Sequence, residues 1–185
     1  MQIQSRKERC RNGSEFIIRS AVLEDASALL DLARSVIAEG HYQITELSEF
    51  QLTVGQERKW IREMTNSQDG VILVAEARGK VIGMLDFQGE RKRRLSHTGF
   101  FGMSVSQPWR GRGVGSALLQ TLLDWAETHP TIEKVCLEVF ADNDRAISLY
   151  HRLGFQEEGR WNRQVKTGEG KYVDLLQMGP VCGRQ

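Results

Sequence analysis

Residues 104–118 have the sequence SVSQPWRGRGVGSAL, which predicts the end of an apolar strand, a glycine-spaced turn and the start of a helix. Gly111, Gly113 and Gly115 carry no Cβ atom, so successive backbone N–H groups can close around an anion. The helix is predicted to begin near Val114, and the positive end of its dipole favours negative charge at the same place. The stretch therefore predicts a phosphate-binding loop, with a diphosphate as its natural ligand.

Two common phosphate-binding loops are disfavoured by the residues around these glycines. A Walker A loop needs Gly-Lys-Ser/Thr at its end, and here Gly115 is followed directly by Ser116. A dinucleotide-binding loop needs three glycines at Gly-x-Gly-x-x-Gly directly after a strand, but residues 107–110 intervene and position 116 is serine. A nucleotide hydrolase would also need the missing lysine and its magnesium ligands.

Two blocks of sequence resemble one known family. The spacing RGRGVG at residues 110–115 resembles the Gln/Arg-x-x-Gly-x-Gly/Ala signature of the GNAT family of N-acetyltransferases. Residues 137–155, LEVFADNDRAISLYHRLGF, resemble the family's second block of strand, Asn-x-x-Ala, helix, Tyr and Gly-Phe. A glycine turn without a function is the alternative for the first block alone, and the second block argues against it. The resemblance covers about residues 15–179.

Composition places the chain among single globular domains without a strongly charged surface. It has 185 residues, 40% of them hydrophobic, which is enough to bury a sizeable core. Lys and Arg total 25 against 24 Asp and Glu, so the net charge of +1 creates no general field for nucleic acid or anionic lipid. We therefore expect neither nucleic acid nor a membrane as a partner.

The N-terminus and the cysteines set further expectations. Residues 1–14 are polar and basic, and we expect a flexible leader there, followed by a single domain over residues 15–185. Cys10, Cys136 and Cys182 are scattered, odd in number and without metal-ligand spacing, which favours the reducing cytoplasm over a disulfide framework or a zinc site. No apolar stretch approaches the roughly 18 residues of a membrane span. We expect no metal site.

Hydrophobic periodicity predicts the element order β-α-α-β-β-β-α-β-α-β-β. The predicted strands are 16–19, 71–77, 81–87, 95–105, 134–140, 155–165 and 171–178, and the helices lie at 22–37, within 45–66, at 114–129 and after 143. The predicted fold class is α/β, of the α+β kind, with a mixed sheet of about seven strands, antiparallel at first, and about four helices. The resemblance implies that strands 95–105 and 134–140 form a parallel pair that splays apart.

The resemblance further implies acetyl-CoA as co-substrate, with its pantetheine arm between the splayed strands. The arm would pair with backbone groups near Met103 and Val105, the diphosphate with the N–H groups of residues 110–115, and the Asn143 side chain with the amide chain. The implied cofactor-binding residues are Met103, Val105, Arg110, Gly111, Arg112, Gly113, Val114, Gly115, Ser116 and Asn143. Whether the side chains of Arg110 and Arg112 contact the phosphates directly is left open, because an arginine side chain at such a position is solvated as often as it binds a phosphate.

Acetyl transfer to an amine requires a base, because an alkylamine with a pKa near about 10.4 is protonated at pH 7. The resemblance implies that Tyr150 gives a proton to the coenzyme A sulfur. Asn143 lies seven residues before Tyr150, so both face the same side of a helix. Glu138, on a strand that borders the splay, is the first candidate base, and His97 is the second, with a pKa near about 6.5 that suits a base. A surface carboxylate and an exposed histidine are the respective alternatives.

The sequence thus predicts an acetyl-CoA-dependent N-acetyltransferase that acts on a primary amine of a small molecule or peptide by direct attack in a ternary complex. A non-catalytic acyl-CoA-binding sensor or scaffold is the alternative. Resemblance places the acceptor determinants near residues 39–43 and 161–163. Glu46, Glu49 and Glu138 favour a cationic amine such as a polyamine, an aminoglycoside or a peptide terminus, with solvated surface acids as the alternative. The basic run at 91–94 is interpreted as a solvated turn. Both a monomer and a homodimer are compatible with the sequence.

Overall fold

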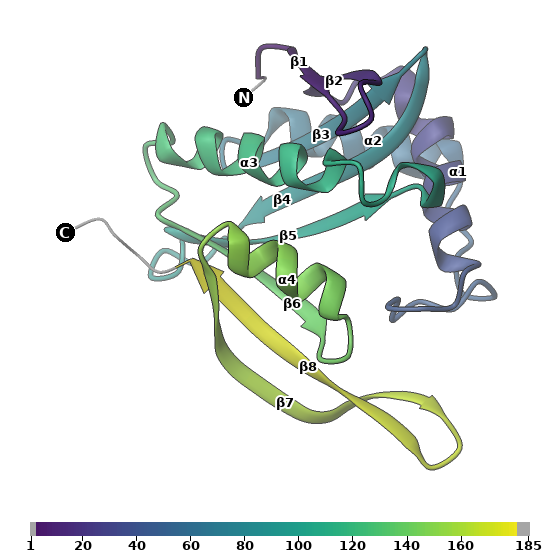
Figure 1. Cartoon of the computed structure of the whole chain (residues 1–185). Coiled ribbons are helices and arrows are strands. Elements are labelled where there is room, and N and C mark those ends of the chain that lie inside the picture. The colour runs from purple at the N-terminus through teal and green to yellow at the C-terminus, as the bar shows by residue number, and fades with distance from the viewer. Residues whose placement is uncertain (1–2, 181–185) are drawn as a thin grey trace.

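The computed structural model describes residues 3–180 and contains one mixed sheet with helices on both faces (Figure 1). The strands are β1 (Arg6–Arg9), β2 (Glu15–Ser20), β3 (Gly70–Ala77), β4 (Lys80–Gly89), β5 (Thr98–Val105), β6 (Lys134–Phe140), β7 (Phe155–Gly168) and β8 (Lys171–Pro180). The α-helices are α1 (Ala26–Ile37), α2 (Val54–Asn66), α3 (Val114–Glu127) and α4 (Asp144–Arg152), and short 3₁₀ turns cover Leu23–Asp25 and Gln107–Trp109. The predicted fold class is confirmed.

Within residues 3–180 the sheet has eight strands in the order β1-β2-β3-β4-β5-β6-β8-β7, and only β5 and β6 are parallel neighbours. Their pairing is short: it joins Thr98 to Lys134, Gly99 to Val135 and Phe100 to Cys136. Beyond Phe100 the two strands diverge, and the rest of β6 pairs with β8 instead. The splay that the resemblance implied is therefore present, and it opens the middle of the sheet.

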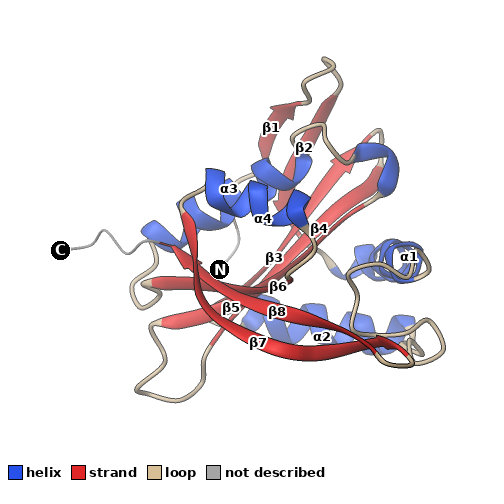
Figure 2. Ribbon diagram, turned by 60° about the horizontal axis from the view of Figure 1, so that its bottom comes forward, coloured by secondary structure: helices blue, strands red, loops and turns tan. Residues whose placement is uncertain are grey.

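The two faces of the sheet have separate hydrophobic cores. On one face Leu118 and Leu122 of α3 are fully buried in the same cluster as Leu85 and Phe87 of β4. On the other face, α1 and α2 supply a smaller cluster with β3, which includes Ile61. Figure 2 shows α3 and α4 on one side of the sheet and α1 and α2 on the other. The splayed strands lie between these two layers, so a ligand in the gap meets both.

Local sequence signals explain where the helices begin. Thr53 and Gln56 form a reciprocal capping box at α2, in which the Gln56 N–H donates to Thr53 Oγ1 and the Thr53 N–H donates to Gln56 Oε1. At α4 the side chain of Asn143 accepts a hydrogen bond from the Ala146 N–H.

No helix within residues 3–180 is both long and apolar enough to cross a membrane.

The N-terminal segment differs from the flexible leader predicted over residues 1–14. Residues 6–9 form strand β1, which pairs antiparallel with β2 at the edge of the sheet, and Cys10 is buried. Charged residues are usual in an edge strand, because they discourage pairing with other chains. Because these residues are all polar, the alternation of apolar residues did not predict this strand. This edge strand raises the count from about seven strands to eight.

A second difference concerns the strand predicted to begin at residue 95. The Leu95 N–H donates to the Lys92 carbonyl and the Thr98 N–H donates to the Leu95 carbonyl, so residues 92–98 turn and β5 begins at Thr98. The basic run 91–94 lies in this exposed turn. Cys182 lies outside the described residues, whereas Cys10 and Cys136 are both buried.

Candidate active site

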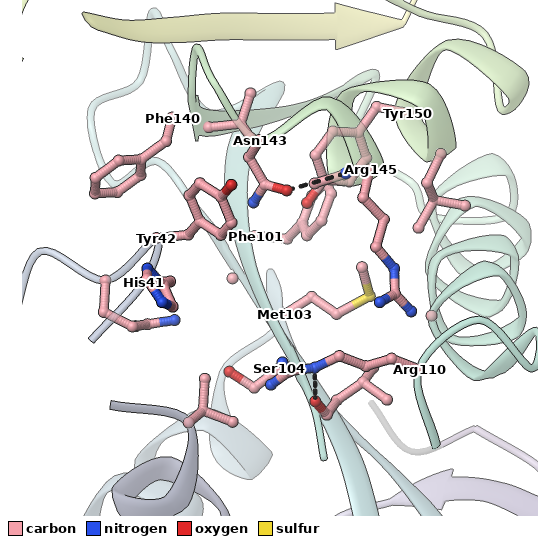
Figure 3. Close-up of a pocket in the computed structure, with 18 of the residues that line it drawn as sticks. His41, Tyr42, Phe101, Met103, Ser104, Arg110, Phe140, Asn143, Arg145 and Tyr150 are labelled. Carbon is pink, nitrogen blue, oxygen red and sulfur yellow. Dashed lines mark hydrogen bonds between the residues drawn. The ribbon is translucent and has the colours of Figure 1, made fainter. Parts of the chain in front are cut away.

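A cleft of about 1290 Å³ lies where β5 and β6 diverge (Figure 3). The glycine loop, residues 110–115, borders it on one side through Arg110, Gly111, Gly113 and Gly115, whereas Arg112 and the buried Val114 do not line it. The loop that follows α1, residues 41–45, borders it on another side. The cleft is also lined by β5 residues 100–105 and by the start of α4. The predicted phosphate loop and the splayed strands therefore belong to one continuous site.

The glycine loop has a backbone that few other residues could adopt. Gly111 has φ 74° and Gly113 has φ 102°, both in the left-handed region. Gly113 is the N-cap of α3 and offers no side chain to its first turn, so the N–H groups there stay available to an anion. A Cβ at Gly115 would approach Met103 Cε to 3.4 Å and Leu149 Cδ2 to 3.5 Å, so this glycine permits close packing. The arrangement fits a diphosphate.

The arginines around the glycine loop have different partners. Arg110 donates from Nε to the Val105 carbonyl at 2.8 Å and from its two terminal nitrogens to Glu39 at 2.5 and 2.7 Å. Its charge is therefore offset by Glu39, and only its backbone is left for the phosphates. The Arg112 guanidinium lies 5.6 Å from the centre of the Trp109 ring. Arg145, which the sequence analysis missed, points toward the loop, and its terminal nitrogen would lie 3.6 Å from a Cβ at Gly111.

Asn143 and Tyr150 both line the cleft, as their helical spacing predicted. The Asn143 Oδ1 atom accepts from the Ala146 N–H at 3.2 Å, and the amide nitrogen points into the cleft (Figure 3). Tyr150 is buried, with 8% of its surface exposed, and its ring packs edge-to-face on Phe101. Burial raises the pKa of Tyr150 to about 12, so its hydroxyl is a proton donor at neutral pH.

The two predicted bases lie in different surroundings. Glu138 is exposed on β6 and lines the cleft. His97 is also exposed, but it lies in the turn before β5, at the end of that strand opposite the glycine loop, and it does not line the cleft. Its carbonyl accepts the N–H groups of Glu133 and Lys134, so its backbone connects β5 to β6. The structure brings Glu138 to the site and leaves His97 outside it.

A third carboxylate, Asp86 of β4, lines the cleft and was missed from the sequence. It lies opposite Gly102 of β5, where a Cβ would come within 3.1 Å of the Asp86 carboxylate. Burial raises the pKa of Asp86 to about 6, and the charge of Asp86 in turn adds to burial in raising the pKa of Glu57. The available signal was an isolated acid inside the apolar strand VIGMLDF at 81–87.

The loop after α1 closes over the cleft through Tyr42. This residue has φ 58°, a strained conformation for a large side chain, and strain of this kind is concentrated at functional sites. Its hydroxyl donates to the Asp142 carbonyl at 3.2 Å, and its ring lies edge-on to Phe140 at 6.0 Å between centroids. Figure 3 shows Tyr42 between His41 and Asn143. Residues 161–163, predicted to be acceptor determinants, do not line the cleft; Leu175 of β8 does.

Comparison with known proteins identifies this arrangement. The model of the acetyltransferase (GNAT) family matches residues 41–155, which contain the splayed strands, the glycine loop, Asn143 and Tyr150. The chain belongs to the GNAT family. It is therefore an acetyl-CoA-dependent N-acetyltransferase, and the predicted family, activity and co-substrate are confirmed.

Relatives and solved structures extend the likeness over nearly the whole GNAT domain. The L-amino acid N-acetyltransferase AaaT of Escherichia coli is 30% identical over 168 residues, which cover 91% of this chain and 99% of that protein. A GNAT acetyltransferase structure from Streptococcus pneumoniae has a TM-score of 0.85 and 26% identity, covering 89% of this chain and 98% of the other. The structure of yncA from Salmonella typhimurium with its cofactor acetyl-CoA has a TM-score of 0.81 at 20% identity, covering 93% and 96%.

Proposed function

We propose that this GNAT enzyme acetylates the free primary amine of a small acceptor of amino-acid size, by direct attack in a ternary complex. The observation that carries this proposal is the bridge from Tyr42 to Asp142, which limits the cleft beside the splayed strands. An internal lysine of an extended polypeptide needs an open groove on both sides, whereas a free amino acid can enter end-on. The name of the Escherichia coli relative, an L-amino acid N-acetyltransferase, supports the same acceptor class.

The proposed chemistry assigns one proton transfer to each side of the splay. Acetyl-CoA supplies a thioester, whose carbonyl carbon the amine nitrogen attacks while the C–S bond breaks. Asp86 accepts the proton of the acceptor ammonium, since its pKa of about 6 leaves it ionised at neutral pH. Tyr150 donates its hydroxyl proton to the leaving sulfur, and the second proton that the nitrogen loses as the amide forms restores the Tyr150 hydroxyl. Both line the cleft.

Asp86 is preferred to Glu138 as the base, although both are kept as candidates. A base is most effective when its pKa lies near the working pH, and burial brings Asp86 to that range. Glu138 lies on β6 beside Gln177 of β8 and is exposed to solvent. His97 is not proposed, because it lies outside the cleft.

The acceptor class is tested with an amine panel and a thiol-release readout. Free L-amino acids, spermidine, peptides with a free N-terminus and lysine peptides with a blocked N-terminus are compared at equal concentration. We expect free amino acids to give the highest kcat/KM. Preference for the blocked lysine peptide would contradict the proposed acceptor. Coenzyme binding without transfer to any amine would favour the sensor or scaffold alternative.

Tyr42→Gly is expected to shift this selectivity toward peptides by about tenfold, because it removes the ring that limits the cleft. Glycine also suits the φ of 58° at this position, so the backbone should keep its course. The measurement is the ratio of kcat/KM for a tripeptide to that for its N-terminal amino acid. Tyr42→Phe separates the two contributions, since it keeps the ring and removes only the hydroxyl that bridges to Asp142. An unchanged ratio in the glycine variant would contradict the role of Tyr42.

Gly113→Ala tests whether the glycine loop holds the diphosphate. No atom lies within 4 Å of a Cβ at this position, but φ 102° is strained for alanine, so the loop backbone must shift. Because of this shift, we expect calorimetry to show that the Kd for coenzyme A rises by about tenfold or more. A tenfold rise corresponds to a loss of about 1.4 kcal/mol of binding free energy. The control is Gly79→Ala in the β3–β4 turn, which has φ 72° and equally open surroundings. Equal coenzyme affinity in both variants would contradict the loop assignment.

The cellular setting and assembly are also proposals. The odd number and scattered positions of Cys10, Cys136 and Cys182 support a reducing compartment, the cytoplasm. Strand β7 is an edge of the sheet and exposes Trp161, which supports a homodimer as the alternative to a monomer. The net charge of +1 supports the absence of a nucleic-acid partner.

A further inference from the structure

The turn between β1 and β2, residues 10–14, is packed against the body of the protein. The Cys10 N–H donates to the Ser14 carbonyl, and the Gly13 N–H donates to the Cys10 carbonyl. Gly13 has φ 84°, which glycine adopts without strain, and the buried Cys10 belongs to the main hydrophobic cluster. This N-terminal turn precedes residue 41, where the match to the family model begins. It is therefore a feature of this chain that the family model does not describe.

The N-terminal turn contacts the glycine loop through the backbone. The Arg11 N–H donates to the Arg112 carbonyl at 3.2 Å. In a trans peptide the carbonyl of one residue and the N–H of the next point in opposite directions. The Gly113 N–H consequently points away from Arg11. The contact fixes this peptide plane before any ligand arrives, so the N-terminal turn helps to preorganise the loop.

The Arg11 side chain has no anionic partner within residues 3–180, although it lines the cleft. Three other arginines are paired: Arg6 with Asp124, Arg9 with Glu15, and Arg110 with Glu39. Within residues 3–180, Arg112 and Arg145 resemble Arg11 in having no ion pair. Arg11 is exposed, so its charge is available to a ligand at the outer edge of the cleft. It approaches the glycine loop from the side of the Arg112 carbonyl.

Coenzyme A presents two separate anionic groups to such a site. Its diphosphate is suited to the loop N–H groups and to Arg145. Its ribose carries a 3′-phosphate monoester, with a charge of about −1.5 to −2 at pH 7, which needs a cation beyond the diphosphate. We propose that Arg11 binds the 3′-phosphate of coenzyme A. The proposal rests on the placement of the diphosphate on the glycine loop, and it makes the N-terminal turn part of the cofactor site.

Calorimetry with coenzyme A and with dephospho-coenzyme A, which lacks only the 3′-phosphate, tests this proposal. Arg11→Gln keeps the backbone N–H that contacts Arg112 and removes the charge. We expect the variant to bind coenzyme A about tenfold more weakly, as loss of a charge-assisted hydrogen bond implies, with less than about a twofold change for dephospho-coenzyme A. Arg9→Gln on β1, outside the cleft, is the matched control and should change neither Kd.

The outcomes separate this inference from the proposal beneath it. An equal loss of affinity for both ligands would overturn the 3′-phosphate assignment and indicate a contact to the diphosphate. Unchanged affinity for both would also overturn it, while leaving the glycine loop intact. Failure of the unmodified protein to bind coenzyme A itself would leave no diphosphate site for Arg11 to complement, and would overturn both. A thermal melt of Arg11→Gln verifies folding, and its exposed position predicts an unchanged Tm.

Discussion

Asp86→Asn should lower kcat/KM by about 10²-fold or more at pH 7.5, because removal of a general base costs roughly 10²- to 10⁴-fold. The same substitution should raise the Tm. Burial raises the pKa of Asp86 from 3.8 to about 6, so the folded state favours the neutral carboxyl. Asparagine is neutral and has a similar shape. Asp86 would then be a residue that lowers the stability of the fold but is needed for the reaction.

The pH dependence of this stability effect has a definite sign. When the pKa of a carboxyl is higher in the folded state than in the unfolded state, protonation stabilises the fold. This contribution to stability is fully present below the unfolded pKa of Asp86, near 3.8, and is lost as the pH rises through its folded pKa of about 6. Above pH 7 the ionised Asp86 costs up to about 3 kcal/mol, less the part that solvent offsets. We expect Asp86→Asn to raise the Tm by several degrees at pH 8 and to leave it nearly unchanged at pH 3.5. A lower Tm at pH 8 would contradict this account.

The pH–rate profile decides between the two candidate bases. A base must be deprotonated to act, so kcat/KM of the unmodified enzyme should fall below about pH 6, and Asp86→Asn should lose this limb. Glu138→Gln is the matched control, because it removes an exposed carboxyl from the opposite strand of the splay. If the limb persists in Asp86→Asn and disappears in Glu138→Gln, the base is Glu138.

Local patterns predicted the parts of this fold that depend on neighbouring residues. The glycine loop and the helix that carries Tyr150 each follow from residues a few positions apart. The bounds of β6 were predicted at residues 134–140 and are found there, because β-branched and apolar residues alternate between a turn and an Asn-capped helix. These features needed no knowledge of distant contacts.

The parts that escaped prediction depend on contacts across the sheet. Arg110 is neutralised by Glu39, which is 71 residues away, and no local pattern links the two. Asp86 became a candidate base only because β4 lies beside the splayed β5, opposite Gly102. His97 was predicted at the start of the strand before β6 but lies in the turn before β5 and outside the cleft, since the strand begins three residues later than its apolar pattern suggested. The sequence shows which chemical group each side chain carries, but it does not show which distant residues surround that group in the fold.

Tyr150→Phe should lower kcat by about 10²-fold while leaving the Kd for coenzyme A within about twofold, as the loss of one general acid predicts. The ring contacts with Phe101 and Phe155 survive in phenylalanine, so the fold should be preserved. Single-turnover kinetics and calorimetry measure the two quantities separately. Tyr172→Phe on β8, outside the cleft, is the matched control.

The raised pKa of Tyr150 makes this role testable without any substitution. A phenol with a pKa of about 12 keeps its proton throughout an assay range of pH 6 to about 10, so Tyr150 should contribute no alkaline loss of kcat there. The acid limb set by Asp86 would then appear without a matching basic limb from the donor. An alkaline limb near pH 9 that disappears in Tyr150→Phe would mean that a lower pKa governs the proton donor. Unchanged turnover of the variant across the pH range would remove Tyr150 from the mechanism, leaving it a packing residue beside Phe101.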